Sequence, residues 1–303
     1  MAKILISDKI TPESVSMLKE KHDVEEFLEW QPEQLIEKIK DFDALVVRSR
    51  TKVTKEIIDA GKNLKIIARA GAGIDNIDSR YAESKGITVL NTPIANLLSV
   101  AELTIGLAIS LLRNIPRADK GMKEGLWEKK KLRGAEISGK KWGIVGLGHV
   151  GELVVQLLKG FNCEIIAYDP YISEEVAVGI GAKLVSLEEL LKESDIVSIH
   201  VPLLDSTRGL IGAKQLSMMK ESAIIINISR GGIIDEKALY EALKGDKIKG
   251  AALDVFEKEP PEGSPLLTLD NTVYTCHLGA NTSDALERVG RGIAEKVLKA
   301  LED

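Results

Sequence analysis

The chain has 303 residues, of which 44% are hydrophobic and 29% are charged, and its formal net charge is −5. This length exceeds what one hydrophobic core usually organises, so we expect two domains. The acidic balance argues against nucleic acid or an anionic membrane as the main partner. Two cysteines in apolar runs, Cys163 and Cys276, and the lack of a signal-peptide pattern indicate a cytoplasmic protein with reduced thiols.

Short apolar strands alternate with amphipathic helices over the first ninety residues, which predicts a parallel sheet covered by helices. The expected strands are Lys3–Ser7, Val24–Phe27, Ala44–Val47, Lys65–Ala68 and Thr88–Leu90. The expected helices are Pro12–Lys21, Pro32–Lys40 and a helix capped by Thr54 that runs to Ala60.

The most apolar stretch of the chain is Ile94–Ile115, which is long enough to be mistaken for a membrane span. It carries Glu102 and Arg113, and a charge in the middle of a bilayer is costly. We therefore expect a helix buried between domains or subunits. Its apolar surface is larger than one cleft can cover, which favours a homodimer formed through the second domain.

The alternation of strands and helices restarts after a polar stretch at Lys120–Gly139. The expected strands are Trp142–Val145, Glu164–Ala167, Lys183–Val185, Ile196–Ile199, Ala223–Asn227, Gly250–Leu253 and Thr272–Thr275. The expected helices are Gly148–Lys159, Leu187–Lys192, Lys214–Met219 and Glu236–Leu243. This predicts a second α/β domain of about six strands, the size of a complete dinucleotide-binding fold. A final helix, Ser283–Leu301, has no strand after it and is expected to pack on the first domain.

A glycine-rich turn opens this second domain. Gly146, Gly148 and Gly151 lie between an apolar strand and a helix, and Asp169 ends the next apolar run. Glycines at this spacing allow a tight turn, an approach of the backbone to a pyrophosphate, and close packing of helix on strand. The carboxylate of Asp169 suits the ribose hydroxyls and would repel a 2′-phosphate. The pattern therefore predicts a dinucleotide site that prefers NAD to NADP.

Three side chains follow strands of the second domain and could carry chemistry. His277 comes directly after an expected strand, and an imidazole can exchange a proton near neutral pH. Glu259 could hydrogen-bond to that imidazole and fix its tautomer. Arg230 ends a buried run, where a guanidinium can hold a substrate carboxylate or polarise a carbonyl group.

Each of these residues also has a purely structural interpretation. His277 could be a loop histidine bonded to the backbone, and His200 is a rival histidine at the same sheet edge. Glu259 could be a surface carboxylate. Arg230 could form a structural ion pair, with Asp254 or Glu236 as its partner. The scattered histidines and cysteines predict no metal site.

The chain resembles the D-isomer-specific 2-hydroxyacid dehydrogenases over nearly its whole length. The segments that carry the resemblance are Val47–Thr54, Arg69–Asn76, Asn91–Pro93, Ala101–Thr104, Gly143–Gly151, Tyr168–Pro170, Asn227–Asp235, Ala251–Phe256, Glu259–Pro261 and His277–Ala280. The resemblance implies an α/β protein of two doubly wound parallel-sheet domains. A Rossmann cofactor domain, residues 95–282, would be inserted into a flavodoxin-like substrate domain, residues 1–94 and 283–303.

The resemblance also implies roles for individual residues. Arg230, Glu259 and His277 would form the catalytic set of an NAD-dependent enzyme. The residues implied to contact the cofactor are Ala72, Gly146, Gly148, His149, Val150, Gly151, Asp169, Val201, Ile228, Ser229, Arg230, Asp254, His277 and Gly279. Those implied to contact the substrate are Arg48, Arg69, Gly71, Ala72, Gly73, Ile74, Asn76, Arg133, Arg230 and His277.

The arginines Arg48, Arg69 and Arg133 favour a phosphorylated substrate, so the expected reaction is oxidation of D-3-phosphoglycerate to 3-phosphohydroxypyruvate. Reduction of glyoxylate, hydroxypyruvate or another D-2-hydroxyacid, and a non-catalytic NADH-sensing corepressor, remain alternatives. Cys276 stands where the family usually has proline, which we expect to leave activity intact. Because the sequence stops at Asp303, we expect no C-terminal regulatory domain and no feedback by serine.

Overall fold

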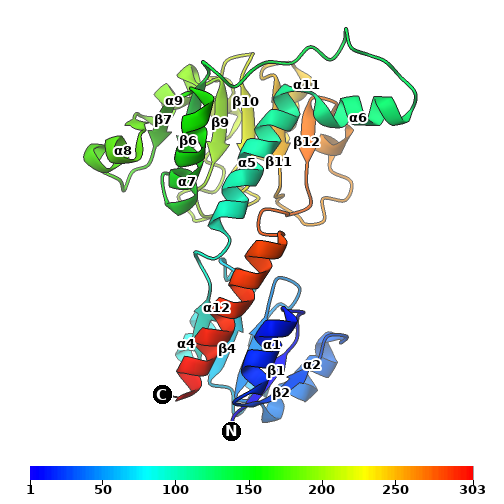
Figure 1. Cartoon of the computed structure of the whole chain (residues 1–303), viewed down its shortest axis with the longest axis vertical. Coiled ribbons are helices and arrows are strands. Elements are labelled where there is room, and N and C mark those ends of the chain that lie inside the picture. Colours follow the sequence, from blue (N-terminus) through cyan, green and yellow to red (C-terminus); the bar gives the residue numbers. More distant parts are fainter. Residues whose placement is uncertain (303) are drawn as a thin grey trace. The chain divides into compact units, whose positions relative to one another are not determined.

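All paired strands in residues 1–302, the part of the chain that the structure describes, run parallel and belong to two separate sheets. In this computed structural model the chain divides into two units (Figure 1). The first unit comprises Met1–Leu97 and Ala280–Asp303, and the second comprises Leu98–Gly279. The α/β fold class expected from the sequence is confirmed.

The first unit contains a five-stranded sheet with the order β2-β1-β3-β4-β5. Its strands are β1 (Lys3–Ile6), β2 (Asp23–Glu26), β3 (Ala44–Val47), β4 (Ile66–Arg69) and β5 (Thr88–Asn91). Its helices are α1 (Pro12–Lys19), α2 (Pro32–Lys38), α3 (Lys55–Ala60), α4 (Ser79–Ser84) and α12 (Ser283–Glu302). This order is that of a flavodoxin-like sheet, in which the direction of strand addition reverses between β1 and β3.

Helices cover both faces of the first sheet because its strands are apolar on both sides. One buried cluster joins the sheet to α1 and α12, which lie alongside each other in Figure 1. The opposite cluster joins the sheet to α2, α3 and α4. The final helix packs on the first sheet, as the sequence predicts.

The second unit contains a seven-stranded sheet with the order β12-β11-β10-β9-β6-β7-β8. Its strands are β6 (Lys141–Val145), β7 (Glu164–Tyr168), β8 (Lys183–Leu184), β9 (Ile196–Ile199), β10 (Ile224–Asn227), β11 (Gly250–Leu253) and β12 (Thr272–Tyr274). Its helices are α5 (Leu97–Leu112), α6 (Ile115–Lys123), α7 (His149–Leu158), α8 (Glu174–Ile180), α9 (Leu187–Glu193), α10 (Ala213–Leu216) and α11 (Glu236–Lys244). The direction of strand addition reverses between β6 and β9, the arrangement of a dinucleotide-binding fold.

The second sheet is also buried on both faces. Side chains of α5, α7 and α8 pack on one face, and those of α9, α10 and α11 pack on the other. Within residues 1–302, no single helix is long and apolar enough to cross a membrane, while the bent pair α5 and α6 passes that test jointly by length and composition alone.

The structure corrects several expected elements. The helix expected over Ile94–Ile115 begins at Leu97 and ends at Leu112. It ends there because Asn114 adopts a left-handed conformation with φ of 54°, and α6 then starts at Ile115 with Pro116 in its first turn. Two further helices, α4 and α8, were not expected. Both are short and begin at a capping side chain, Asp78 and Ser173 respectively, so they lack a long apolar periodicity. The second sheet has seven strands, and each overlaps one of the seven ranges expected from the sequence.

Candidate active site

The glycine turn after β6 has the backbone that its sequence requires. Gly146 has a φ of 94°, and a Cβ on it would lie 2.6 Å from Cγ1 of Val201. A Cβ on Gly151 would overlap the carbonyl oxygen of Gly146. Nothing lies within 4 Å of the position that a Cβ on Gly148 would take, so open space lies over the N-terminus of α7. The turn can therefore receive a bulky anionic group against the backbone.

Asp169 lies beside this turn and braces it. One carboxylate oxygen accepts the Leu147 N–H at 2.9 Å, and the other accepts the Tyr171 N–H at 2.9 Å. Each oxygen keeps a further lone pair that could accept a ribose hydroxyl. The turn lies where β6 meets β9 in the sheet, at the switch point where open α/β sheets bind ligands. These residues fit a dinucleotide such as NAD.

The other cofactor candidates of the second unit also lie near carboxyl ends of its strands. His149 and Val150 begin α7, and Val201 comes two residues after β9. Ile228 and Ser229 directly follow β10, and Asp254 directly follows β11. Gly279 follows the loop after β12, and a Cβ on it would lie 3.2 Å from an oxygen of Asp254.

His277 and Glu259 meet in the structure. The Nδ1 atom of His277 lies 2.8 Å from Oε2 of Glu259, and the two side chains are 52% and 39% exposed. A carboxylate can only accept, so Nδ1 carries the proton and Nε2 presents a lone pair. The other Glu259 oxygen accepts the Phe256 N–H at 3.2 Å, which fixes the carboxylate. This geometry provides a proton acceptor that is oriented and accessible.

Asp254 holds the loop that carries His277, a role that sequence reasoning missed. Its side chain is 1% exposed and accepts hydrogen bonds from Thr275 Oγ1 at 2.6 Å, Leu278 N at 2.7 Å and Gly279 N at 2.8 Å. The His277 N–H donates to the Asp254 carbonyl at 2.9 Å, and His277 has a φ of 57°. The loop is therefore fastened on both sides of the imidazole. The available signal was an aspartate placed directly after an apolar strand.

Arg230 lies on a turn organised by Asn227, another buried residue that the sequence analysis did not single out. The Asn227 amide donates to the Arg230 carbonyl at 2.9 Å, and its oxygen accepts the N–H of Ser229 at 3.1 Å. The Arg230 guanidinium donates to the Ser229 carbonyl at 2.7 Å. Because β10, β11 and β12 are neighbours, Arg230, Glu259 and His277 share one edge of the sheet. The two acids considered as partners of Arg230 have other described partners: Asp254 accepts from Thr275, Leu278 and Gly279, and Glu236 accepts the Glu257 N–H.

His200, the rival histidine, is placed differently. Its Nε2 lies 2.9 Å from Oγ of Ser198, which also accepts the indole N–H of Trp142 at 2.8 Å. Its Nδ1 is out of contact with solvent, and burial lowers the pKa of His200 to about 3. A neutral imidazole held inside the sheet is a poor partner for a substrate proton, so the geometry favours His277.

In the first unit, the loop after β4 presents successive backbone N–H groups. In the described part of the chain, the N–H groups of Ala72, Gly73 and Ile74 have no acceptor, whereas the Gly71 N–H donates to the Arg69 carbonyl at 2.9 Å. Successive N–H groups of this kind can bind a carboxylate. The Arg69 guanidinium donates to the Gly73 carbonyl and so braces this loop.

Two other substrate candidates lie apart from that loop's N–H groups. Arg48 directly follows β3, and its Nη1 donates to the Lys9 carbonyl at 3.3 Å. Arg133 is exposed in the segment after α6. The amide of Asn76 has a structural role, because it donates to the carbonyls of Arg48 and Thr51, at 2.7 and 2.6 Å. Within residues 1–302 no group of histidine, cysteine and acidic side chains could hold a metal ion.

Known proteins with similar sequences and structures support this description. Residues 105–279 match the NAD binding domain of the D-isomer specific 2-hydroxyacid dehydrogenases. The D-3-phosphoglycerate dehydrogenase of Methanocaldococcus jannaschii is 50% identical over 99% of this chain, which spans 58% of that protein. The hydroxypyruvate reductase of Thermotoga maritima is 47% identical over 99% of this chain and 98% of its own length.

Among solved structures, the D-lactate dehydrogenase of Aquifex aeolicus, complexed with NAD and lactic acid, has a TM-score of 0.85 at 27% identity and covers 99% of this chain and 95% of its own. The matched domain contains the glycine turn, Asp169 and the His277–Glu259 pair. The chain therefore belongs to the D-isomer specific 2-hydroxyacid dehydrogenase family, and its second unit carries that family's NAD-binding domain.

Proposed function

We propose that this chain catalyses the NAD-dependent oxidation of D-3-phosphoglycerate to 3-phosphohydroxypyruvate, the entry to serine biosynthesis. The observation that carries the reaction type is the 2.8 Å contact between His277 and Glu259 at an accessible edge of the cofactor-binding sheet. The substrate is supported by the name of the M. jannaschii relative and by the cationic side chains after β3 and β4.

The first step assigned to this chain's residues is removal of a proton. Nε2 of His277 accepts the proton of the C2 hydroxyl, while Nδ1 continues to donate to Glu259. The carboxylate then faces the positive imidazolium and stabilises it. Bound NAD supplies the acceptor for the hydride that leaves C2. In the reverse direction, the imidazolium returns its proton to the ketone oxygen.

Other residues hold the substrate in the required orientation. The Arg230 guanidinium is suited to the carboxylate and to the C2 oxygen, whose negative charge grows as the proton leaves. In the first unit, the N–H groups of Ala72, Gly73 and Ile74 are suited to an anionic group. Arg48 is the phosphate partner that the first unit offers, because its guanidinium lines a cavity of about 200 Å³ together with Lys9 and Ala70.

A second candidate function is reduction of hydroxypyruvate, which lacks the phosphate. It is favoured by the T. maritima relative, which this chain matches over 98% of that protein. The same His277–Glu259 pair would serve, with the imidazolium as the acid. The two functions differ in whether Arg48 contributes to substrate affinity.

The test is a comparison of substrates with the purified chain. NADH formation is followed with D-3-phosphoglycerate, D-glycerate and D-lactate, and NADH consumption with hydroxypyruvate. We expect the highest kcat/KM for D-3-phosphoglycerate, by at least tenfold over D-glycerate, because a charge-assisted hydrogen bond is worth about that factor. Equal values for the two acids would favour the reductase. Absence of turnover with every acid would favour the NADH-sensing corepressor.

We also propose that two copies of the chain associate through α6 and the segment that follows it. Apolar side chains gather there, including Met122 at 55%, Leu126 at 47% and Trp127 at 78% exposure. They line a cavity of about 290 Å³ that a second copy could fill. Light scattering should give the mass of a dimer, and Trp127→Glu should shift it toward the monomer. A monomeric wild type would contradict this proposal.

A further inference from the structure

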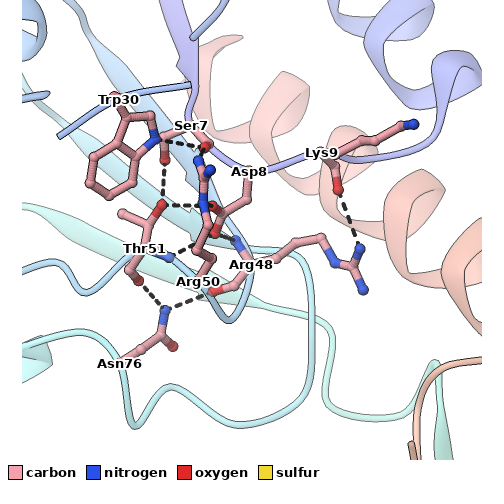
Figure 2. A network of polar contacts seen from close by, with 8 residues as sticks. All are labelled: Ser7, Asp8, Lys9, Trp30, Arg48, Arg50, Thr51 and Asn76. Carbon is pink, nitrogen blue, oxygen red and sulfur yellow. Dashed lines mark hydrogen bonds and ion pairs between the residues drawn. The ribbon is translucent and has the colours of Figure 1, made fainter. Parts of the chain in front are cut away.

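Asp8, two residues after β1, is a buried carboxylate that none of the steps above uses. Its side chain is 4% exposed, and burial of a charge is costly unless the charge is paired and hydrogen-bonded. Figure 2 shows that its partners all come from the turn after β3. The carboxylate accepts the N–H groups of Arg48 at 2.6 Å and Thr51 at 3.0 Å, and the Thr51 hydroxyl at 2.8 Å. One carboxylate therefore fixes the backbone of residues 48–51.

Arg50 forms an ion pair with this carboxylate, and two of its three guanidinium nitrogens donate hydrogen bonds to the residues after β1. Its Nε lies 3.1 Å from Oδ1 of Asp8, and its Nη2 donates to the Ser7 carbonyl at 2.5 Å. The guanidinium also lies over the Trp30 ring, 4.9 Å from its centroid, and the Trp30 indole N–H donates to the same carbonyl. Arg50 is thus a structural partner of Asp8, although its side chain is 55% exposed.

The far side of the turn is closed by Asn76, whose amide donates to the Arg48 and Thr51 carbonyls. The Ser7 hydroxyl adds a bond to Thr51 Oγ1 at 2.9 Å; because Thr51 donates to Asp8, Ser7 is the donor. Both the N–H side and the carbonyl side of the turn are therefore held by side chains of other elements, as Figure 2 shows.

The guanidinium groups of Arg48 and Arg50 have different partners, although the two residues are separated by only one residue. The Arg48 N–H is bound to Asp8, but the Arg48 guanidinium has a single described partner, the Lys9 carbonyl at 3.3 Å. Arg48 and Lys9 both line two cavities, of about 200 and 400 Å³, whereas Arg50 lines only the second of these. Both cavities lie at the carboxyl ends of β1 and β3, where this sheet reverses its order of strands.

We propose that Asp8 is the positioning residue for substrate recognition in the first unit: it fixes the 48–51 turn and pairs with Arg50, so that Arg48 presents its guanidinium to the anionic end of the substrate in the cavity of about 200 Å³. This inference rests on the proposed function. It assigns different roles to Arg48 and Arg50, which the sequence alone does not distinguish. Asp8 itself touches no substrate atom in this account.

The test is a double-mutant cycle with Asp8→Asn and Arg48→Gln, read as KM and kcat for D-3-phosphoglycerate. An amide keeps the shape of the carboxylate but places an NH₂ group against donors. We expect Asp8→Asn to raise KM about tenfold and to change kcat by less than about threefold. In the Arg48→Gln background, Asp8→Asn should lower kcat/KM by less than about twofold, because the two residues act as one unit.

Asp43→Asn is the matched control. Asp43 also accepts a backbone N–H, from Lys3 at 2.9 Å, but it precedes β3 at the opposite end of the same sheet. Its KM should stay within about twofold of the wild type. If Asp8→Asn does not fold, Thr51→Val removes one bond to the carboxylate and should raise KM about threefold.

An unchanged KM in Asp8→Asn, or an equal loss with and without Arg48, would overturn the inference. So would an equal rise in KM in Asp43→Asn. A wild type that does not oxidise D-3-phosphoglycerate would instead refute the proposed function. In that case, the same variants are compared by the rise in melting temperature that D-3-phosphoglycerate produces. An equal rise in wild type and Asp8→Asn would refute the inference on its own.

Discussion

Two buried aspartates, one in each unit, fix a neighbouring loop in the same way but differ in their partners. Asp8 follows β1 and fixes the turn after the neighbouring β3, whereas Asp254 follows β11 and fixes the loop after the neighbouring β12. The described partners of Asp254 are N–H and hydroxyl groups. Those of Asp8 include the Arg50 guanidinium.

The difference explains what each loop can do. Asp254 accepts the backbone N–H groups of the two residues that follow His277, so it holds the imidazole in place for a proton transfer. The charge of Asp8 is matched by Arg50, so the nearby positive charge of Arg48 is left for an anion. Under the proposed function, a buried aspartate would position a proton acceptor in one unit and an anion-binding side chain in the other.

The largest effect is expected from removal of the His277 imidazole, which tests its role as the proton acceptor. His277→Asn should lower kcat by about 10²–10⁴-fold, the range typical of a lost general base. NADH affinity, measured by fluorescence, should change by less than about threefold, because the glycine turn and Asp169 are untouched. Loss of turnover and NADH binding together would show that His277 is structural.

Asp254→Asn should produce the next largest loss. It removes an acceptor from the Leu278 or Gly279 N–H, and these bonds hold the loop that carries His277. We expect kcat to fall about 30-fold with KM within about threefold, because the proton acceptor is misplaced but Arg48 is not. Asp270→Asn, at the other end of β12, is the control and should retain activity.

Removing the anion partner should have a smaller and selective effect. Arg48→Gln should lower kcat/KM for D-3-phosphoglycerate about tenfold and that for D-glycerate by less than about twofold. Lys52→Gln removes an exposed positive charge from the same loop and serves as the control. Equal losses with the two acids would mean that Arg48 does not contact the phosphate.

The smallest effect concerns stability and pH, through His200. Its pKa of about 3 in the folded chain lies below the ordinary value near 6.5, so the unfolded chain binds the extra proton between these two values. The contribution of neutral His200 to stability is thus complete above pH 6.5 and is lost as the pH falls toward 3. The urea midpoint of His200→Gln should fall less between pH 7 and 5 than that of the wild type. His149→Gln, on an exposed residue, should behave as the wild type does.

The sequence predicts much of the fold because apolar runs and glycine turns are local signals. Gly146, Gly151 and Asp169 could be read at fixed spacing, and the family resemblance supplied Glu259 as the partner of His277. The roles of Asp8 and Asp254 could not be read, because each depends on a neighbouring strand that is distant in sequence. For the same reason, nothing in the sequence separates Arg48 from Arg50. The short helix α8 was missed because its seven residues are too few to show an apolar periodicity.

The most direct test of this account is steady-state kinetics of Asp8→Asn and Asp254→Asn, side by side, on D-3-phosphoglycerate and NAD. The account predicts opposite signatures: Asp8→Asn raises KM and spares kcat, whereas Asp254→Asn lowers kcat and spares KM. The same pattern in both variants would contradict the division of labour between the two aspartates.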